Sequence, residues 1–80
     1  MQAELRSAKK VVGLKQLRKA LREDAVEKVF VADDAEARVT DPVIQACRES
    51  GVTVEQVPTM AQLGEACGIE VGAAVAGLLK

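Results

Sequence analysis

The chain has 80 residues, of which 49% are hydrophobic and 29% charged, and its formal net charge is −1. A chain of this length forms one small domain, expected here over residues 1–80, because it buries only about 60% of the surface that its unfolded form exposes. Its apolar runs fall far short of the roughly 20 residues that cross a bilayer, and the first residues lack the apolar region of a signal peptide. We therefore expect a cytoplasmic protein with no membrane partner.

The first part of the chain predicts a short helix over residues 2–9 and a minimal strand at 11–12. Gly13 ends the strand and opens a second helix, which continues to about Arg22. Glycine suits this junction because it adopts backbone conformations that other residues avoid.

The second helix has a core side and a basic side. On a helical wheel Leu14, Leu17 and Leu21 lie within one narrow arc, and the adjacent face carries Lys15, Arg18, Lys19 and Arg22. The first N–H groups of such a helix have no partner within it, and helix ends of this kind bind phosphate readily. The basic side therefore suggests an anionic ligand.

The remaining elements alternate between strands and helices. Residues 26–32 predict a buried strand, Asp41 as N-cap and Pro42 as first residue predict a helix that ends at Gly51, and residues 52–57 predict a strand. Thr59 and Gln62 form a capping box for a helix through Cys67, and residues 73–79 form the last strand. This order predicts an α/β fold: a three-layer α/β/α sandwich with helices on both faces of a four-stranded mixed sheet.

Charge is divided along the chain. Residues 1–22 contain seven basic residues and one acidic residue, a net charge of +6, whereas residues 23–80 contain four basic and eleven acidic residues, a net charge of −7. The overall balance therefore hides a basic N-terminal segment that could attract a polyanion.

The residues that usually carry metal or catalytic chemistry are scarce. The chain has no histidine, and Cys47 and Cys67 are twenty positions apart without C-x-x-C spacing, so we expect no metal site and no cofactor. Each cysteine follows small apolar residues late in a predicted helix, which is typical of a buried thiol in a reducing compartment. An enzyme with Cys67 as nucleophile has little support without a histidine.

A shaped loop precedes the last strand. Gly68 suits the left-handed position that ends a helix, and Gly72 lets the backbone leave the loop without a Cβ clash. Between them, Ile69 and Val71 lie outside any periodic pattern that would bury them. Aliphatic side chains in such a loop are typically presented to a partner.

Two motifs, together with the order of the elements, resemble a known family. They are Gly13-Leu14-Lys15-Gln16 at the head of the second helix and Ala66-Cys67-Gly68-Ile69-Glu70-Val71 before the last strand. Along essentially its whole length the chain resembles the kink-turn-binding ribosomal protein family of archaeal and eukaryotic large subunits, in its short bacterial, YbxF-like branch. In that family the first motif is Gly-x-Asn-Glu in archaeal and eukaryotic members and Gly-x-Lys-Gln in bacterial ones.

The resemblance implies a single RNA-binding domain without enzymatic activity, which recognises the tandem sheared G·A pairs of a kink-turn RNA and stabilises the kinked form. The RNA could be a ribosomal RNA or a riboswitch. Base-reading residues implied by the resemblance are Gly13, Lys15, Gln16, Ile69, Glu70 and Val71, and RNA-backbone contacts are expected from Lys9, Lys10, Arg18, Lys19 and Arg22. One position departs from the family: Leu14 stands where a hydroxyl residue is common, and we expect it to face the core.

A second hypothesis belongs to a different class of protein. The same sandwich could serve as a protein-interaction module, with Ile69 and Val71 as a hydrophobic anchor and the acidic second part of the chain on another face. In either case we expect a monomer.

Overall fold

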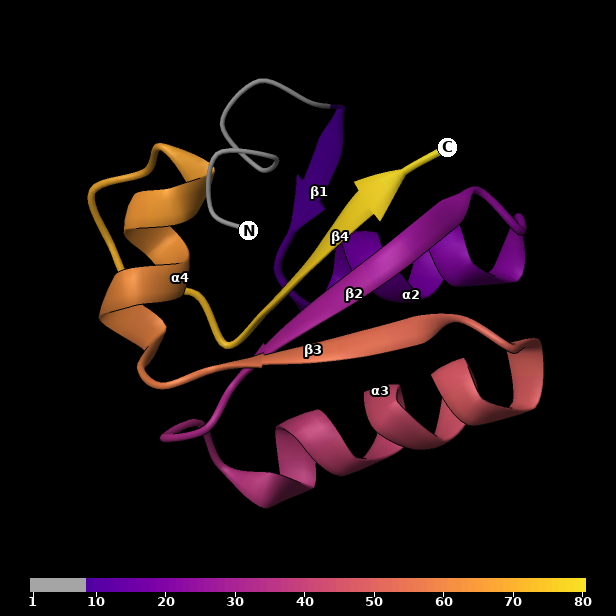
Figure 1. Ribbon diagram of the computed structural model, residues 1–80, viewed down its shortest axis with the longest axis horizontal. Helices are drawn as coiled ribbons and strands as arrows, with labels where there is room; N and C mark the ends of the chain where they lie inside the picture. The colour runs from indigo at the N-terminus through magenta and orange to yellow at the C-terminus, as the bar shows by residue number, and fades with distance from the viewer. Residues whose placement is uncertain (1–8) are drawn as a thin grey trace.

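A four-stranded sheet and three helices make up residues 9–80, the part of the chain that the computed structural model describes (Figure 1). The elements are β1 (Lys10–Val12), α2 (Leu14–Arg22), β2 (Val26–Ala32), α3 (Ala37–Ser50), β3 (Thr53–Val57), α4 (Met60–Cys67) and β4 (Val75–Leu79). The helix expected over residues 2–9 lies outside this range except for its last position. Among residues 9–80, none of the helices is long and apolar enough to cross a bilayer.

The sheet is mixed, as predicted, with strand order β1-β4-β2-β3. β4 runs antiparallel to both of its neighbours, and β2 pairs in parallel with the edge strand β3. Phe30, near the middle of β2, is registered with Ala76 on one side and with Glu55 on the other.

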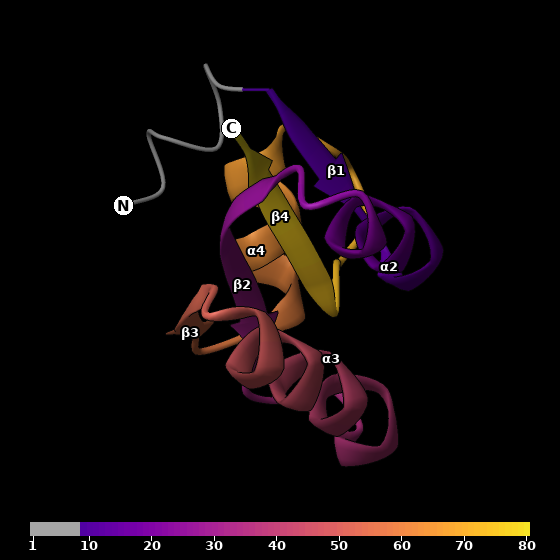
Figure 2. The same cartoon turned by 90° about the vertical axis from the view of Figure 1, so that its right-hand side faces the viewer.

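Helices cover both faces of the sheet, which confirms the three-layer arrangement (Figure 2). Alternate residues of β2 point to opposite faces. Val29 packs with Leu17 of α2 and Val43 of α3, whereas Phe30 packs with Leu63 of α4, and all five side chains are buried. The molecule therefore has two hydrophobic cores, one on each side of the sheet.

Small residues in β4 allow α2 to lie close to the sheet. A Cβ atom at Gly77 would lie 2.6 Å from Cδ1 of Leu17 and 3.3 Å from Cγ2 of Val11. The glycine thus makes room for a fully buried leucine from the basic helix.

The predicted start of α3 at Asp41 and Pro42 is wrong. The helix begins at Ala37, with Glu36 as N-cap, and Pro42 lies inside it as the sixth residue. The missing N–H of Pro42 costs one intrahelical bond, to the carbonyl of Arg38, and both of these residues are exposed. The extra turn also buries Thr40. No side chain caps the helix at Glu36, so its true start carries no capping signal in the sequence.

Two strands are shorter than predicted. β3 begins at Thr53 rather than at residue 52, and β4 begins at Val75 rather than at residue 73. Ala73 is buried, but its N–H donates to the carbonyl of Met60 at 3.0 Å. Its backbone therefore bonds to α4 and joins no strand.

One of the two hydrogen bonds of the predicted capping box of α4 is confirmed, the one that the Thr59 side chain accepts. Oγ1 of Thr59 accepts a hydrogen bond from the N–H of Gln62 at 3.1 Å. Oδ1 of Asp34, in the turn after β2, accepts from the N–H of Met60 at 2.7 Å. Two side chains therefore satisfy backbone donors in the first turn of this helix.

The Thr59 cap can be tested with two variants, one that removes the side-chain hydroxyl and one that retains it. We expect Thr59→Ala to lower the free energy of unfolding by about 1 kcal/mol, because the N–H of Gln62 loses its acceptor. Thr59→Ser keeps the oxygen and should stay close to wild type. Urea denaturation followed by circular dichroism measures both changes, and equal losses in the two variants would contradict the cap.

Candidate nucleic-acid interface

The start of α2 is exposed and uncapped. Gly13 precedes the helix with φ 97° and ψ 156°, a conformation that favours glycine, and it offers no capping side chain. The first turn contains no acidic residue and carries the exposed Lys15 instead. A cation is unfavourable at the positive end of the helix dipole. This end of α2 therefore combines free N–H donors with positive charge, which suits a ligand rich in acceptors or anions.

The rest of α2 continues this charge. Lys15, Arg18, Lys19 and Arg22 are all exposed, and we call them the basic face of α2. None of the four forms an ion pair with a residue in the described range, where the salt bridges are Lys28–Glu55, Arg38–Glu36 and Lys80–Asp24. The charge of the basic face is therefore available to a ligand.

Leu14 and Leu21 flank the basic face, while Leu17 is fully buried between them. Leu14 is partly buried against the core beneath α2, as predicted, and also lines a hollow of about 440 Å³ together with Lys15, Arg18 and Arg22. A ligand in this hollow would meet one apolar side chain among three cations.

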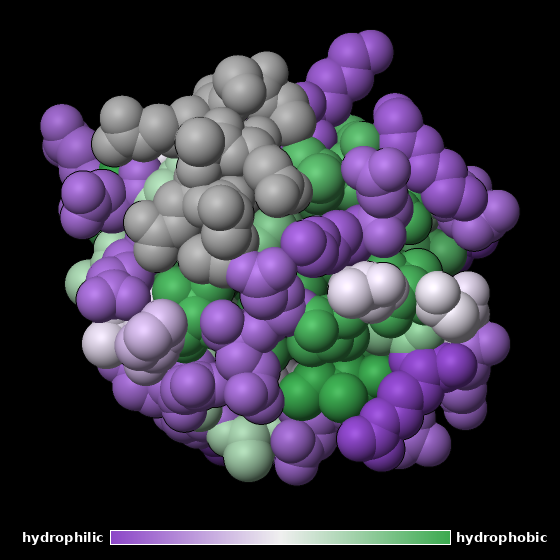
Figure 3. Space-filling model, viewed as in Figure 1, coloured by the Kyte–Doolittle hydropathy of each residue, from purple (hydrophilic) through white to green (hydrophobic). Residues whose placement is uncertain are grey.

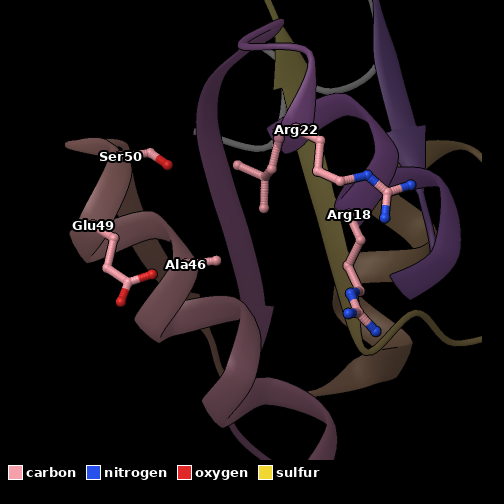
Figure 4. A pocket seen from close by; sticks show the side chains of 6 residues that line it. Arg18, Arg22, Ala46, Glu49 and Ser50 are labelled. Atoms are coloured by element: carbon pink, nitrogen blue, oxygen red, sulfur yellow. The ribbon is translucent and has the colours of Figure 1, made fainter.

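A second hollow of about 240 Å³ lies between α2 and α3, where Arg18 and Arg22 stand opposite Glu49 and Ser50 (Figure 4). Figure 4 shows both arginine head groups pointing away from Glu49. The carboxylate of Glu49 therefore does not neutralise the basic face of α2.

The loop between α4 and β4 folds back along the helix. Gly68 ends α4 in the left-handed conformation, φ 80°, as predicted, and the N–H of Ile69 donates to the carbonyl of Gly64 at 3.1 Å. The chain then passes so close to α4 that a Cβ atom on Gly64 would lie 2.0 Å from the carbonyl oxygen of Val71. Gly72 is also close, since its Cβ would lie 3.1 Å from that of Met60. The loop backbone is therefore docked on the helix.

The side chains of this loop face outward. Val71 is 71% exposed and Ile69 36%, and they are the exposed large hydrophobic residues of the described range. Glu70 between them is exposed as well. The structure therefore confirms that Ile69 and Val71 are not buried in the core, as their lack of a periodic pattern predicted.

The start of α2 and the loop lie at the same end of the sheet. The N–H of Gly13 donates to the carbonyl of Val75 at 3.1 Å, next to the pair that joins Val12 to Ala76. Figures 1 and 2 show the loop entering β4 beside the turn between β1 and α2. The two sequence motifs are therefore neighbours, although about fifty residues separate them in the chain.

Lys9 and Lys10 lie at the other end of β1. The carbonyl of Lys9 accepts from the N–H of Leu79, and Lys10 is registered with Leu78. The charge of Lys10 acts on the Cys67 thiol at the end of α4. Both lysines are thus separate from the start of α2, and Lys10 lies toward α4.

Both cysteines are buried and free. Burial raises the pKa of the Cys47 thiol and of the Cys67 thiol, and the charge of Lys10 opposes the rise at Cys67 only in part. A raised pKa keeps the thiols protonated, and the thiolate is the nucleophilic form. Within residues 9–80 no cluster of three or more histidine, cysteine, aspartate or glutamate side chains is placed to hold a metal ion.

Gly64 is a site residue that the sequence analysis missed. Its position within a predicted helix carried a signal, because glycine is unfavourable in a helix interior and often marks a close approach of another segment. The chain that approaches it is the loop itself.

These features define the class of protein: an α/β/α sandwich in which a basic helix with an uncapped start lies beside an apolar loop. The sequence matches the family described as the ribosomal protein L7Ae/L30e/S12e/Gadd45 family over residues 1–80. The chain belongs to this family, as the two motifs predicted.

Relatives agree with this assignment, and a solved structure shares the fold. An RNA-binding protein of Geobacillus sp. (strain WCH70) is 42% identical over 76 residues, which cover 95% of this chain and 93% of the relative. The RNA-binding protein YbxF of Geobacillus stearothermophilus is 41% identical over 76 residues with the same coverage, which confirms the expected branch. The Giardia lamblia 15.5kD RNA binding protein shares the fold, with a TM-score of 0.89 at 24% identity over 99% of this chain and 70% of that one. The family and its members point to a non-enzymatic protein.

The docking of the loop on Gly64 can be tested by adding one methyl group. Although alanine is the better helix former by about 1 kcal/mol, we expect Gly64→Ala to lower the free energy of unfolding by about 1–3 kcal/mol, because the new Cβ must displace the carbonyl of Val71. The amide NMR signals of residues 69–73 should shift as well.

Glu65→Ala is the matched control, since Glu65 is the exposed neighbour on the same helix. It should leave both the stability and the loop signals near wild type. A Gly64→Ala variant that is as stable as wild type and has unchanged loop signals would contradict the docking.

The thiol environment predicts slow alkylation. At about pH 8, iodoacetamide should modify Cys67 at least about tenfold more slowly in the native chain than in urea, because burial limits access and the raised pKa lowers the thiolate fraction. Peptide mass spectrometry follows Cys47 and Cys67 separately. Equal rates for native and unfolded Cys67 would show an accessible, reactive thiol.

Proposed function

We propose that this chain is a monomeric, cytoplasmic RNA-binding protein that recognises kink-turn RNA through its tandem sheared G·A pairs. The observation that carries the proposal is the hydrogen bond from Gly13 to Val75, which joins the uncapped start of α2 to the end of the apolar loop. The RNA-binding proteins among its relatives support the same class of ligand. Its free, buried cysteines suit a reducing compartment.

In this proposal Lys15 and Gln16 read base edges. Both side chains are exposed in the first turn of α2, after a glycine whose missing side chain lets a nucleic-acid backbone come close. A lysine donates to O6 and N7 of guanine, and a glutamine both donates and accepts at an adenine edge. The major groove of regular A-form RNA excludes side chains, but a kink beside non-Watson-Crick pairs opens it. The first turn of α2 therefore suits a kinked RNA better than a regular duplex.

The loop supplies an apolar cover for bases at the kink. Ile69 and Val71 present aliphatic surface where single-strand binders generally use aromatic rings. The exposed Glu70 lies between them and can accept a hydrogen bond from a base amino group. Because the backbone is docked at Gly64, the positions of these side chains are fixed before RNA arrives.

The basic face of α2 would neutralise phosphates on the RNA that continues beyond the kink. Arg18, Lys19 and Arg22 have no ion-pair partners in the described range, so they do not have to break internal contacts to bind. Lys9 and Lys10, at the end of β1 away from Gly13, would contact the RNA backbone at a separate place. Such contacts orient the RNA but carry no sequence information.

Preference for the kinked form also gives the chain an effect on RNA folding. A ligand that binds one of two conformations more tightly shifts the population toward it. The protein would thus stabilise the kinked RNA without doing chemistry on it.

Recognition of sheared G·A pairs can be tested with two RNAs. Wild-type protein should bind a kink-turn RNA much more tightly than the same RNA with its G·A pairs changed to Watson-Crick pairs. We expect Lys15→Ala and Gln16→Ala each to cost about 1–3 kcal/mol on the kink-turn and to reduce the difference between the two RNAs. Equal wild-type affinity for both RNAs would refute specific recognition.

Lys19→Ala provides the matched control on the same helix. It should weaken binding to both RNAs by a similar factor and reduce the salt dependence of log K by about 1, as expected for the loss of one phosphate contact. A titration series in salt separates this behaviour from that of the base-reading variants.

The 71% exposure of Val71 also favours the protein-interaction hypothesis. In that case the loop would bind a protein, and the basic face of α2 would be dispensable. A partner retained after nuclease treatment and lost in Ile69→Asp, together with weak binding to both RNAs, would favour this second function.

A further inference from the structure

The strand β3 leaves one edge of the sheet open. It is the last strand in the order β1-β4-β2-β3, and within residues 9–80 it pairs only with β2, in parallel. The opposite edge is the short β1, which lies beside the start of α2. The open edge is therefore on the far side of the sheet from the proposed RNA site.

Two of the five residues of β3 direct their backbone groups away from the sheet. The carbonyl of Val57 accepts from the N–H of Asp33 at 2.8 Å, so Val57 directs its carbonyl toward β2. In a parallel ladder this direction alternates from residue to residue. Val54 and Gln56 consequently direct their N–H and C=O groups outward, where a further strand could bind.

A groove with aliphatic and polar side chains runs beside this edge. It has a volume of about 520 Å³ and is lined by Ile44 and Arg48 of α3 and by Val52, Val54, Glu55 and Gln56. Three of these side chains, Ile44, Val52 and Val54, are aliphatic and only partly buried. Figure 3 shows hydrophobic surface over β3 and α3, with hydrophilic side chains around it.

The charged group of the groove that has no ion-pair partner among residues 9–80 is positive. Glu55 is already paired with Lys28 at 2.9 Å, whereas Arg48 forms no ion pair with any residue from 9 to 80. Arg48 is exposed at the rim, above the aliphatic surface. A ligand that matches the groove therefore combines an apolar side chain with a carboxylate.

We infer that the β3 edge is a docking site for an extended acidic segment of another protein, which adds to the sheet as a fifth strand. The segment bonds to the outward backbone groups of Val54 and Gln56 and packs an apolar side chain over Ile44. Its carboxylate pairs with Arg48. The inference does not depend on RNA binding, since it uses none of the residues at the start of α2.

A second copy of the chain fits this edge less well. Antiparallel pairing about the middle of β3 would place Glu55 opposite the same residue of the copy, and like charges directly opposite each other are destabilising. A nucleic acid also fits poorly, because it offers no strand backbone to bond to Val54 and Gln56.

The test uses the full chain and a phage-displayed library of short random peptides. Peptides selected on wild type should alternate apolar and polar residues and carry an acidic residue. Gln56→Pro removes only an outward N–H on an edge strand, where proline is tolerated. It should weaken the selected peptides by about tenfold or more, because one hydrogen bond is lost and the added strand meets the proline ring.

Arg48→Glu is a second variant at an exposed position, so it tests the site even if Gln56→Pro does not fold. It should also weaken the selected peptides by about tenfold or more. Arg38→Glu, on the exposed first part of the same helix, is the matched control and should change the affinity by less than about twofold. In the complex, amide exchange at Val54 and Gln56 should slow.

Several results would overturn the inference. They are the absence of peptides enriched on wild type over Arg48→Glu, enriched peptides without an acidic residue, and peptide binding that leaves the Val54 and Gln56 amides unprotected. Concentration-dependent protection of these amides without peptide would assign the edge to a second copy instead. Competition by RNA for the same amides would assign it to nucleic acid.

Discussion

The pairing of β1 with β4 is the interaction on which the candidate site depends. β1 has only three residues, yet it fixes where α2 begins, because Gly13 continues the ladder by donating to Val75. The loop ends just before Val75 on the neighbouring strand. A register shift of one residue between β1 and β4 would displace the start of α2 relative to the loop. It would also turn the side chains of Val11 and Val12 to the opposite faces of the sheet. The site is therefore specified by backbone pairing before any side chain contacts a ligand.

α2 combines a structural and a functional role, and the two make different demands on its sequence. Leu17 and Ala20 hold the helix on the sheet. On the outer side, Lys15 lies at the positive end of the helix dipole without a compensating acid. Stability alone would favour an acidic residue there. A local rule broken in this way at an exposed position is typical of a functional site.

Elements whose local signals agreed with their packing could be predicted from the sequence. The Gly68 stop, the Thr59 cap and the buried β2 are examples, and the exposure of Val71 followed from the lack of any periodic pattern around it. α3 could not be placed correctly, because its N-cap residue Glu36 makes no capping hydrogen bond, whereas Asp41 and Pro42 carry a start signal inside the helix. The docking of the loop on Gly64 could not be predicted from the sequence either. A close approach depends on where another segment passes, and a single glycine does not reveal which segment that is.

The docked loop also bears on the entropy of ligand binding. Fixing the backbone of a mobile residue costs about 1–2 kcal/mol of conformational free energy at room temperature. In a flexible loop this cost reduces the free energy of ligand binding. In this protein the hydrogen bonds to the carbonyls of Gly64 and Met60 have already ordered the segment from Ile69 to Ala73. The backbone of this segment is thus ordered during folding, before any ligand binds. Affinity gained in this way comes from reduced disorder in the unbound state rather than from additional contacts in the bound one.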